Sequence, residues 1–444
     1  MNLCGQLYFL IISFVALAIP SHAKTIFVDD NASAGGDGTT WASAHKYLQD
    51  ALAGAEYGDE IWVAEGTYKP DQGAGKTAGD RASPFVLVNG VGMYGGFLGS
   101  ESSRDPQGDN NQTILSGEID SNSSLWSIHV LSGGKLSEST VLDGFRVTKG
   151  NANLEDISGK GGGCFLFGSS LKIEDCIFLE NFSKYEGAGF YAGDCVLIVK
   201  NCDFIKNKSS KYGGGICSME SKAFIFETRF RSNEASSGGG VYSQQSKIEI
   251  KSSNFALNSA RFGGDYLHLG GGGIAGVDSN MTLYLSNFNS NTARVYGDSG
   301  GGIFLSGGIV KIDQCDFKEN YSHEWGGGVY GSNKSALEIL DCNFSENDCG
   351  DRGGALAING AIITGCIFSS NTGATGSVDV KNSIISNSQF LNNQNAVLST
   401  GCTFNKCVFS NNFSEFYREN FNLNSLGETK VSNCIFSENE GALA

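Results

Sequence analysis

A short phrase that recurs through the second half of the chain constrains its fold more than any other feature. Each copy has a phenylalanine followed, three residues on, by an asparagine, and in most copies a glycine-rich cluster comes several residues later. The copies begin at Phe178, Phe204, Phe230, Phe255, Phe288, Phe317, Phe344, Phe368, Phe390, Phe409 and Phe436. A period of roughly 20 to 30 residues is typical of solenoids, in which one repeat cannot bury its apolar face and must stack on a copy of itself.

Polar and apolar residues alternate inside each copy, as in Leu171-Lys172-Ile173. This period of two is typical of a strand with one buried face. We therefore predict columns of stacked phenylalanines in the core, and asparagines at strand ends that hydrogen-bond to one another and to turn backbone. The predicted columns contain Phe178, Phe204, Phe230, Phe255, Phe288, Phe317 and Phe344, with Asn181, Asn207, Asn233, Asn258, Asn291, Asn320 and Asn347.

The cysteines follow the same repeat. The chain has 13, and one set lies two residues before the phenylalanine, at Cys176, Cys202, Cys315, Cys342, Cys366, Cys407 and Cys434. Equivalent residues on stacked rungs lie about 4.8 Å apart, whereas a disulfide needs Cβ atoms near ~3.8 Å. We predict a buried column of mostly free thiols, with metal binding as the alternative.

The glycine clusters predict tight turns and close packing between rungs, because the 62 glycines recur at fixed places while prolines number only 4. Phosphate binding is the competing interpretation. It is disfavoured because no Lys-Ser/Thr pair follows the clusters and no helix is indicated after them.

The N-terminus carries a predicted export signal. An apolar run from Leu7 to Ile19 ends in Pro20 and the small-x-small sequence Ser21-His22-Ala23. The run is shorter than the roughly 20 residues that a spanning helix needs, so an uncleaved anchor is the alternative. We expect cleavage before Lys24 and no transmembrane span in the mature chain.

The formal net charge of -16 argues against nucleic acid and anionic lipid as partners. It also disfavours polyanionic glycans unless a divalent cation mediates.

The first part of the mature chain predicts a cap and the first rungs. Strand-like runs at 25–28, 60–64, 84–88, 113–115, 127–131 and 140–148 surround one helical pattern. That pattern starts at Trp41, places Ala44, Leu48, Ala51 and Leu52 on one face, and has Thr39 or Thr40 as N-cap. A solenoid needs its open first rung covered, so we expect this helix to be the cap.

Two stretches resemble known families. I-F-V-D-D, a short helix and G-D-E-I-W-V-A-E-G-T-Y, over about 25–69, resemble the opening of right-handed parallel β-helix proteins of the pectate-lyase-like superfamily. The paired GGA/GGG-I/V and F-x-x-N motifs, over about 161–442, resemble the repeats of chlamydial polymorphic outer membrane proteins. The second resemblance implies secretion or display at a bacterial outer membrane, often as an adhesin.

We therefore predict an all-β chain, a single right-handed parallel β-helix with a short N-terminal capping helix. Residues 1–23 are the expected signal peptide, 24–160 the cap and first rungs, and 161–444 the repeat rungs of the same solenoid.

A candidate binding site follows from the two longest intervals between copies, after Phe255 and after Phe288. Both additions fall in the same turn, so neighbouring rungs are expected to push out adjacent loops. Aromatic rings, carboxylates and histidines on one edge could bind a sugar or Ca²⁺. Loop variation without function is the competing interpretation. The residues are Asp265, Tyr266, His268, Tyr296, Asp298, His323, Glu324 and Trp325.

Aromatic residues before the glycine clusters form a second candidate. They could stack against a glycan chain, or simply cover the corner of each rung. They are Tyr185, Tyr212, Phe262, Tyr296 and Trp325, with Lys184, Lys211 and Arg261 beside some of them.

No hydrolase motif and no zinc-protease motif occurs in the sequence, and no catalytic residue is identified. The leading hypothesis is an adhesin-like surface protein that binds glycans or cell-envelope components without catalysis or a cofactor. The alternatives are a polysaccharide lyase or glycoside hydrolase of the pectate-lyase-like superfamily, and a purely structural envelope protein.

Overall fold

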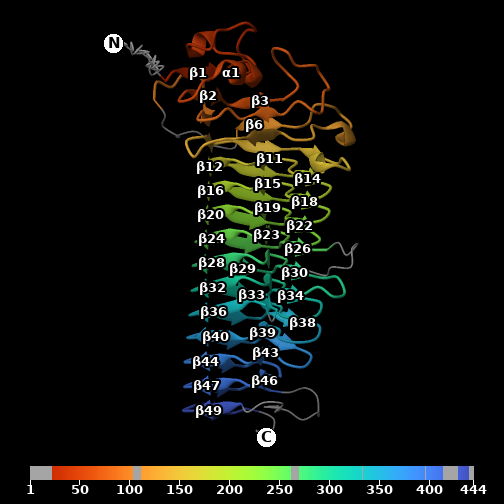
Figure 1. The fold of residues 1–444 in the computed structure, drawn as a ribbon, viewed down its shortest axis with the longest axis vertical. Coiled ribbons are helices and arrows are strands. Elements are labelled where there is room, and N and C mark those ends of the chain that lie inside the picture. The colour runs from red at the N-terminus through yellow and green to blue at the C-terminus, as the bar shows by residue number, and fades with distance from the viewer. Residues whose placement is uncertain are drawn as a thin grey trace, which may run out of the picture.

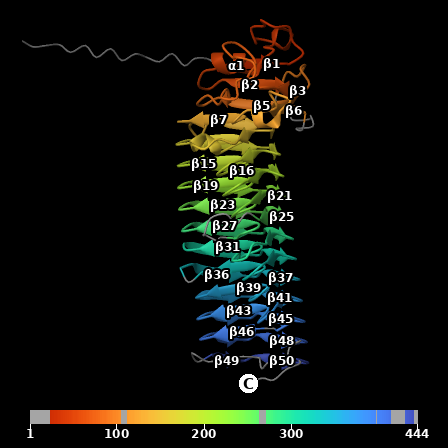
Figure 2. The same ribbon diagram turned by 90° about the vertical axis from the view of Figure 1, so that its right-hand side faces the viewer.

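The computed structural model describes residues 23–103, 112–261, 270–332, 334–395, 397–413 and 429–439. These residues wind into a right-handed parallel β-helix whose rungs stack along one axis (Figures 1 and 2). The predicted fold class is confirmed. The predicted signal peptide, apart from Ala23, lies outside the described residues and stays a prediction.

Each complete rung adds one strand to each of four parallel sheets, which we name A to D. Along the chain a rung runs from sheet C to A, B and D, as in β15, β16, β17 and β18.

Sheet A comprises β1 (Thr25–Val28), β2 (Glu60–Ala64), β5 (Gly92–Phe97), β8 (Val141–Asp143), β12 (Ser170–Glu174), β16 (Val196–Lys200), β20 (Lys222–Phe226), β24 (Lys247–Lys251), β28 (Asn280–Tyr284), β32 (Ile309–Asp313), β36 (Ala336–Leu340), β40 (Ala361–Thr364), β44 (Ile384–Ser386), β47 (Thr403–Asn405) and β49 (Lys430–Ser432). Sheet B comprises β3 (Gly66–Tyr68), β6 (Thr113–Ser116), β9 (Arg146–Thr148), β13 (Ile177–Leu179), β17 (Asp203–Ile205), β21 (Arg229–Arg231), β25 (Asn254–Ala256), β29 (Asn287–Asn289), β33 (Asp316–Lys318), β37 (Asn343–Ser345), β41 (Ile367–Ser369), β45 (Gln389–Leu391), β48 (Val408–Ser410) and β50 (Ile435–Ser437).

Sheet C comprises β4 (Phe85–Val86), β7 (Leu131–Gly134), β11 (Cys164–Phe167), β15 (Phe190–Gly193), β19 (Ile216–Met219), β23 (Val241–Gln244), β27 (Ile274–Val277), β31 (Ile303–Ser306), β35 (Val329–Gly331), β39 (Leu356–Asn359), β43 (Val378–Lys381) and β46 (Val397–Thr400). Sheet D comprises the short strands β10 (Asn151–Ala152), β14 (Phe182–Ser183), β18 (Lys208–Ser209), β22 (Glu234–Ala235), β26 (Ser259–Ala260), β30 (Thr292–Ala293), β34 (Tyr321–Ser322), β38 (Asp348–Cys349) and β42 (Thr372–Gly373).

The helical segment near the N-terminus is shorter than predicted. A 3₁₀ turn, η1 (Trp41–Ser43), and one α-helix, α1 (Leu48–Gly54), are separated by extended residues. The break has a physical cause. The backbone of His45 donates to Phe27 and accepts from Asp29, so this segment pairs with β1 instead of coiling. Thr40 caps η1, as predicted for the start of the pattern, and α1 lies at the N-terminal end of the solenoid (Figure 1).

Two further 3₁₀ turns, η2 (Ser123–Leu125) and η3 (Ile157–Gly159), lie in the first rungs. The predicted strand at 127–131 is displaced, because Leu131 is where β7 begins to pair with β4 and β11. β5 was not predicted, since its glycines hide the alternation of its apolar residues.

The phenylalanine column forms the centre of the core in sheet B. Consecutive rings stack face to face with centroids between 4.6 and 5.1 Å apart, from Phe178 to Phe436. The rings from Phe178 to Phe409 are buried. Burial of apolar surface is the main favourable contribution to the free energy of folding, and this column contributes to it.

The asparagine column closes the turn after each phenylalanine. The side chain of Asn258 donates through Nδ2 to the Phe230 carbonyl at 2.8 Å and to Asn291 Oδ1 at 3.0 Å. Its own Oδ1 accepts from the backbone N–H and the Nδ2 of Asn233. The same pattern runs from Asn181 to Asn439, so these buried amides are satisfied rung after rung.

The glycine clusters pack where rungs approach most closely. A Cβ on Gly215 would lie 2.6 Å from the Gly240 carbonyl oxygen, and Gly213 has φ of 65°. A side chain at the first of these positions would push the rungs apart, and at the second would strain the backbone.

The described cysteines are all free, and all are buried except the half-buried Cys434. None of the helices in the described parts of the chain has the length and apolar character to cross a bilayer.

Candidate functional site

The outer face of sheet C carries a continuous row of side chains, because residues alternate between core and surface along each strand. We call it the outer row. Register places its members one above another: Phe165, Tyr191, Cys217, Tyr242, Ala275, Phe304, Tyr330, Ala357, Asp379 and Leu398.

Much of the outer row is apolar and packed, which is unusual for a face directed away from the core. Tyr191, Cys217, Tyr242, Ala275 and Phe304 form a second buried hydrophobic cluster. Rings stack along it, with Phe165 and Tyr191 at 5.3 Å and Phe304 and Tyr330 at 5.4 Å.

The corner aromatics differ in what they do. Tyr212 stacks on Tyr242 at 4.5 Å and so covers part of the row. Tyr185 lies under the ammonium of Lys211, 5.2 Å from the ring centre, and its hydroxyl donates to Glu155. For Tyr212 this geometry matches the corner-covering interpretation. Phe262 lies outside the described residues.

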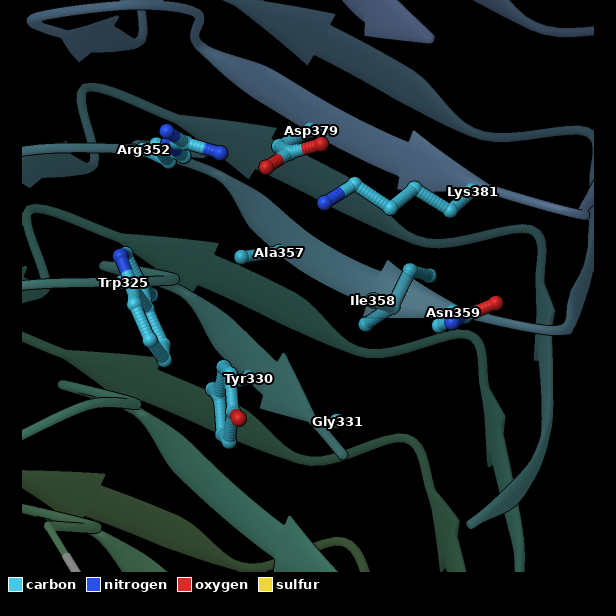
Figure 3. A pocket seen from close by; sticks show the side chains of 9 residues that line it. All are labelled: Trp325, Tyr330, Gly331, Arg352, Ala357, Ile358, Asn359, Asp379 and Lys381. Carbon is cyan, nitrogen blue, oxygen red and sulfur yellow. The ribbon is translucent and has the colours of Figure 1, made fainter. Parts of the chain in front are cut away.

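A hollow opens in this face where the row leaves the packed cluster. We call it the sheet C hollow, and it spans β35, β39 and β43 (Figure 3). Its lining residues are Trp325, Tyr330, Gly331, Arg352, Ala357, Ile358, Asn359, Asp379 and Lys381. Its volume is about 150 Å³, which corresponds to several water molecules at roughly 30 Å³ each.

Aromatic rings form one end of the hollow. Trp325 and Tyr330 have ring centroids 5.7 Å apart, and Trp325 is 37% exposed. The indole Nε1 donates to Asp351 Oδ2 at 3.0 Å, which fixes the orientation of the ring. The two rings thus offer a held, partly exposed apolar surface.

Charged groups form the other end, where Figure 3 shows Arg352, Asp379 and Lys381 together. Asp379 is only 6% exposed, and its Oδ1 has no hydrogen-bond partner among the described residues. Burial raises the pKa of the Asp379 carboxyl, while Lys381 and Arg352 act in the opposite direction. The hollow therefore combines an aromatic platform with two cationic donors and one carboxylate.

The predicted loop cluster is only partly visible. Asp265, Tyr266 and His268 lie outside the described residues. Tyr296 is 75% exposed, and its ring meets that of His323 edge-on at 5.5 Å. Glu324 is half-buried beside them, and its backbone N–H donates to the Asp298 carbonyl.

Two of the predicted residues are placed differently from the expectation. Asp298 is 3% exposed, because its Oδ2 turns inward and accepts from the Val295 N–H at 3.1 Å. It is therefore not part of an exposed carboxylate edge. Trp325 lines the sheet C hollow, together with residues that the sequence had not linked to it.

Tyr330, Arg352, Asp379 and Lys381 were not predicted. The sequence carries one signal, an aspartate at the position of a sheet C strand where other rungs have apolar residues. Reading that signal requires the register between rungs of unequal length. No group of three or more His, Cys, Asp and Glu side chains suited to a metal ion occurs in the described ranges.

Residues 193–357 match the family model described as a right handed beta helix region, which agrees with the observed fold. A search of curated proteins found no match. Among solved structures, pectate lyase Pel9A is 14% identical with a TM-score of 0.47, covering 77% of this chain and 78% of its own. A rhamnogalacturonan lyase is 13% identical with a TM-score of 0.42, covering 78% and 82%. PfbA, a surface adhesin of Streptococcus pneumoniae, is 10% identical with a TM-score of 0.32, covering 94% and 93%.

Proposed function

We propose that this protein is an exported, surface-associated binding protein that holds a polysaccharide on the outer face of sheet C without cleaving it. The observation that carries the proposal is the sheet C hollow, where Trp325 and Tyr330 stand beside Arg352, Asp379 and Lys381. Export itself rests on the predicted signal sequence.

The chemistry of the hollow suits a sugar. The C–H face of a sugar ring packs on an aromatic ring, and its hydroxyls need nearby donors and acceptors. Trp325 supplies the exposed ring, Arg352 and Lys381 supply donors, and Asp379 supplies an acceptor. A solenoid also presents its side chains along an extended surface, which suits a long polymer.

Binding without hydrolysis is favoured by the number of acidic residues that line the hollow. Most glycoside hydrolases place two carboxyl groups roughly 5 to 10 Å apart across the scissile bond. Among the residues that line the hollow in the described chain, Asp379 is the one acidic residue, and the neighbouring Asp351 carboxylate is held by Trp325 Nε1 and Arg352.

One experiment distinguishes a binding protein from an enzyme that cleaves the polysaccharide. The purified protein is incubated with a panel of neutral and acidic polysaccharides and followed by affinity gel electrophoresis and by assays for reducing and unsaturated ends. We expect retardation by at least one polysaccharide with no new ends. New ends would assign a hydrolase or a lyase, and retention by none would favour a purely structural protein.

The location of binding is tested by Trp325→Ala. Loss of the indole removes the stacking surface, so we expect affinity for the retained polysaccharide to fall about tenfold or more, equivalent to about 1.4 kcal/mol. Tyr57, a 62% exposed tyrosine of the cap, supplies the matched control Tyr57→Ala, which should bind normally.

Tyr296→Ala tests the other candidate, the loop corner beside His323. Unchanged binding by this variant, together with weak binding by Trp325→Ala, places the polymer in the hollow. The reverse result would move the site to the corner.

A further inference from the structure

Asp379 breaks the pattern of the outer row. Its partners in the neighbouring strands are Ala357 on one side and Leu398 on the other. Across the members of the row named above, Asp379 is the one charged residue. A charge in an apolar row is a local conflict, and such conflicts are concentrated at functional sites.

The conflict is not resolved inside the protein. Asp379 Oδ1 lacks a hydrogen-bond partner although the residue is buried, and none of the ion pairs formed by the described residues includes Asp379. The side chains that face it are Lys381 on its own strand and Arg352 and Asp351 from the preceding turn. A buried acceptor without a donor destabilises the fold, so stability does not explain the residue.

The Asp379 carboxyl lines the hollow beside the two aromatic rings, so a ligand bound there would meet it (Figure 3). We propose that Asp379 determines specificity by accepting hydrogen bonds from the hydroxyls of a neutral sugar unit whose ring lies on Trp325 and Tyr330. Arg352 and Lys381 donate to other oxygen atoms of that unit. This inference rests on the proposed function and names the class of sugar.

The charges around the hollow favour a neutral sugar over an acidic one. The two cations, Arg352 and Lys381, are matched by Asp379 and by Asp351, whose Oδ1 lies 3.8 Å from Arg352 Nε. A uronate carboxylate placed in the hollow would meet the Asp379 carboxylate, and two like charges repel each other. A neutral hydroxyl would donate a hydrogen bond to that carboxylate instead.

The test compares wild type with Asp379→Asn on the neutral polysaccharides of the panel and on polygalacturonate. We expect wild type to be retained by a neutral polysaccharide and at least tenfold less by polygalacturonate. Asp379→Asn should bind the neutral polymer about tenfold more weakly and lose most of the discrimination, because the amide no longer accepts through two charged oxygens. Asp379→Ala, which copies Ala357 of the neighbouring rung, is the second variant should the amide fold poorly.

Measuring retention over a pH series distinguishes a binding role of Asp379 from a structural one. Wild-type retention should weaken as the pH falls and the carboxyl takes up a proton, whereas retention of Asp379→Asn should change little. Asp316→Asn is the matched control, because the neighbouring strands of sheet B already carry Asn287 and Asn343 at that position. It should behave as wild type.

The possible outcomes distinguish a failure of the proposed role of Asp379 from a failure of the proposed polysaccharide binding. Equal binding of neutral polymer by wild type and Asp379→Asn, or a wild-type preference for polygalacturonate, overturns the role of Asp379. The proposed function survives either result so long as Trp325→Ala still lowers the affinity for the retained polysaccharide. If no polysaccharide is retained, both proposals fall.

Discussion

Two buried polar residues, Asn258 and Asp379, differ in whether their polar atoms have partners. The side chain of Asn258 is fully buried, and both its nitrogen and its oxygen are hydrogen-bonded. Asp379 is nearly as buried, yet Oδ1 is unpartnered. A satisfied buried group stabilises the fold modestly, while an unsatisfied one is costly. We therefore interpret Asn258 as structural and Asp379 as a residue kept for binding.

The cost of Asp379 should be visible as a pH-dependent stability. Burial raises the pKa of its carboxyl in the folded state, so the folded protein favours the protonated form. That preference is fully stabilising below the unfolded pKa of about 3.9 and is lost as the pH rises through the folded pKa. By calorimetry, Asp379→Asn should therefore unfold about 1 to 3 °C above wild type at pH 7 and at nearly the same temperature at pH 3.5.

The control for that comparison is again Asp316→Asn, whose site is exposed. It should track wild type at both pH values. A lower unfolding temperature for Asp379→Asn at pH 7 would mean that the carboxylate is stabilising, and would remove the argument that binding explains its retention.

At the scale of elements, the turn after each sheet B strand from β13 onward is held by the asparagine column. Asn258→Ala would remove the side-chain donor to the Phe230 carbonyl, the acceptor of the Asn233 backbone N–H and one of the two acceptors of Asn233 Nδ2, which also donates to the Phe204 carbonyl. Since each unsatisfied buried group costs roughly 1 to 3 kcal/mol, we expect a loss of about 2 to 5 kcal/mol.

Urea unfolding followed by circular dichroism measures this loss. Asn287→Ala, at an exposed position of the same sheet, is the matched control and should change stability by no more than about 0.5 kcal/mol. Equal unfolding midpoints for the two variants would show that the asparagine column does not hold the turns.

These elements also show why the fold was predictable and the site was not. The phenylalanine and asparagine columns follow from residues within one repeat, because the alternation and the motif are local. The helix was predicted too long, since the pairing of His45 with β1 is a contact made by tertiary structure. The hollow depends on register between three rungs, so Trp325 was identified while Tyr330, Arg352, Asp379 and Lys381 were missed.

At the scale of the whole molecule, the chain is an elongated column with its helix at one end (Figure 2). Its interior is filled by stacked side chains, so binding has to occur on an outer face. The outer row places an aromatic cluster on the outside of sheet C, and the hollow is where aromatic surface lies beside charged groups. This arrangement is what the proposed polymer binding depends on.

Hydroxyl-radical footprinting of the wild-type protein, with and without the retained polysaccharide, tests this account most directly. Radicals oxidise exposed aromatic rings, so a bound polymer should lower the oxidation of Trp325 and Tyr330 at least twofold. Tyr57 and Tyr296, the exposed aromatic controls, should be oxidised at the same rate in both samples. Unchanged oxidation of Trp325 and Tyr330 under saturating polysaccharide would contradict the account, as would protection confined to Tyr296.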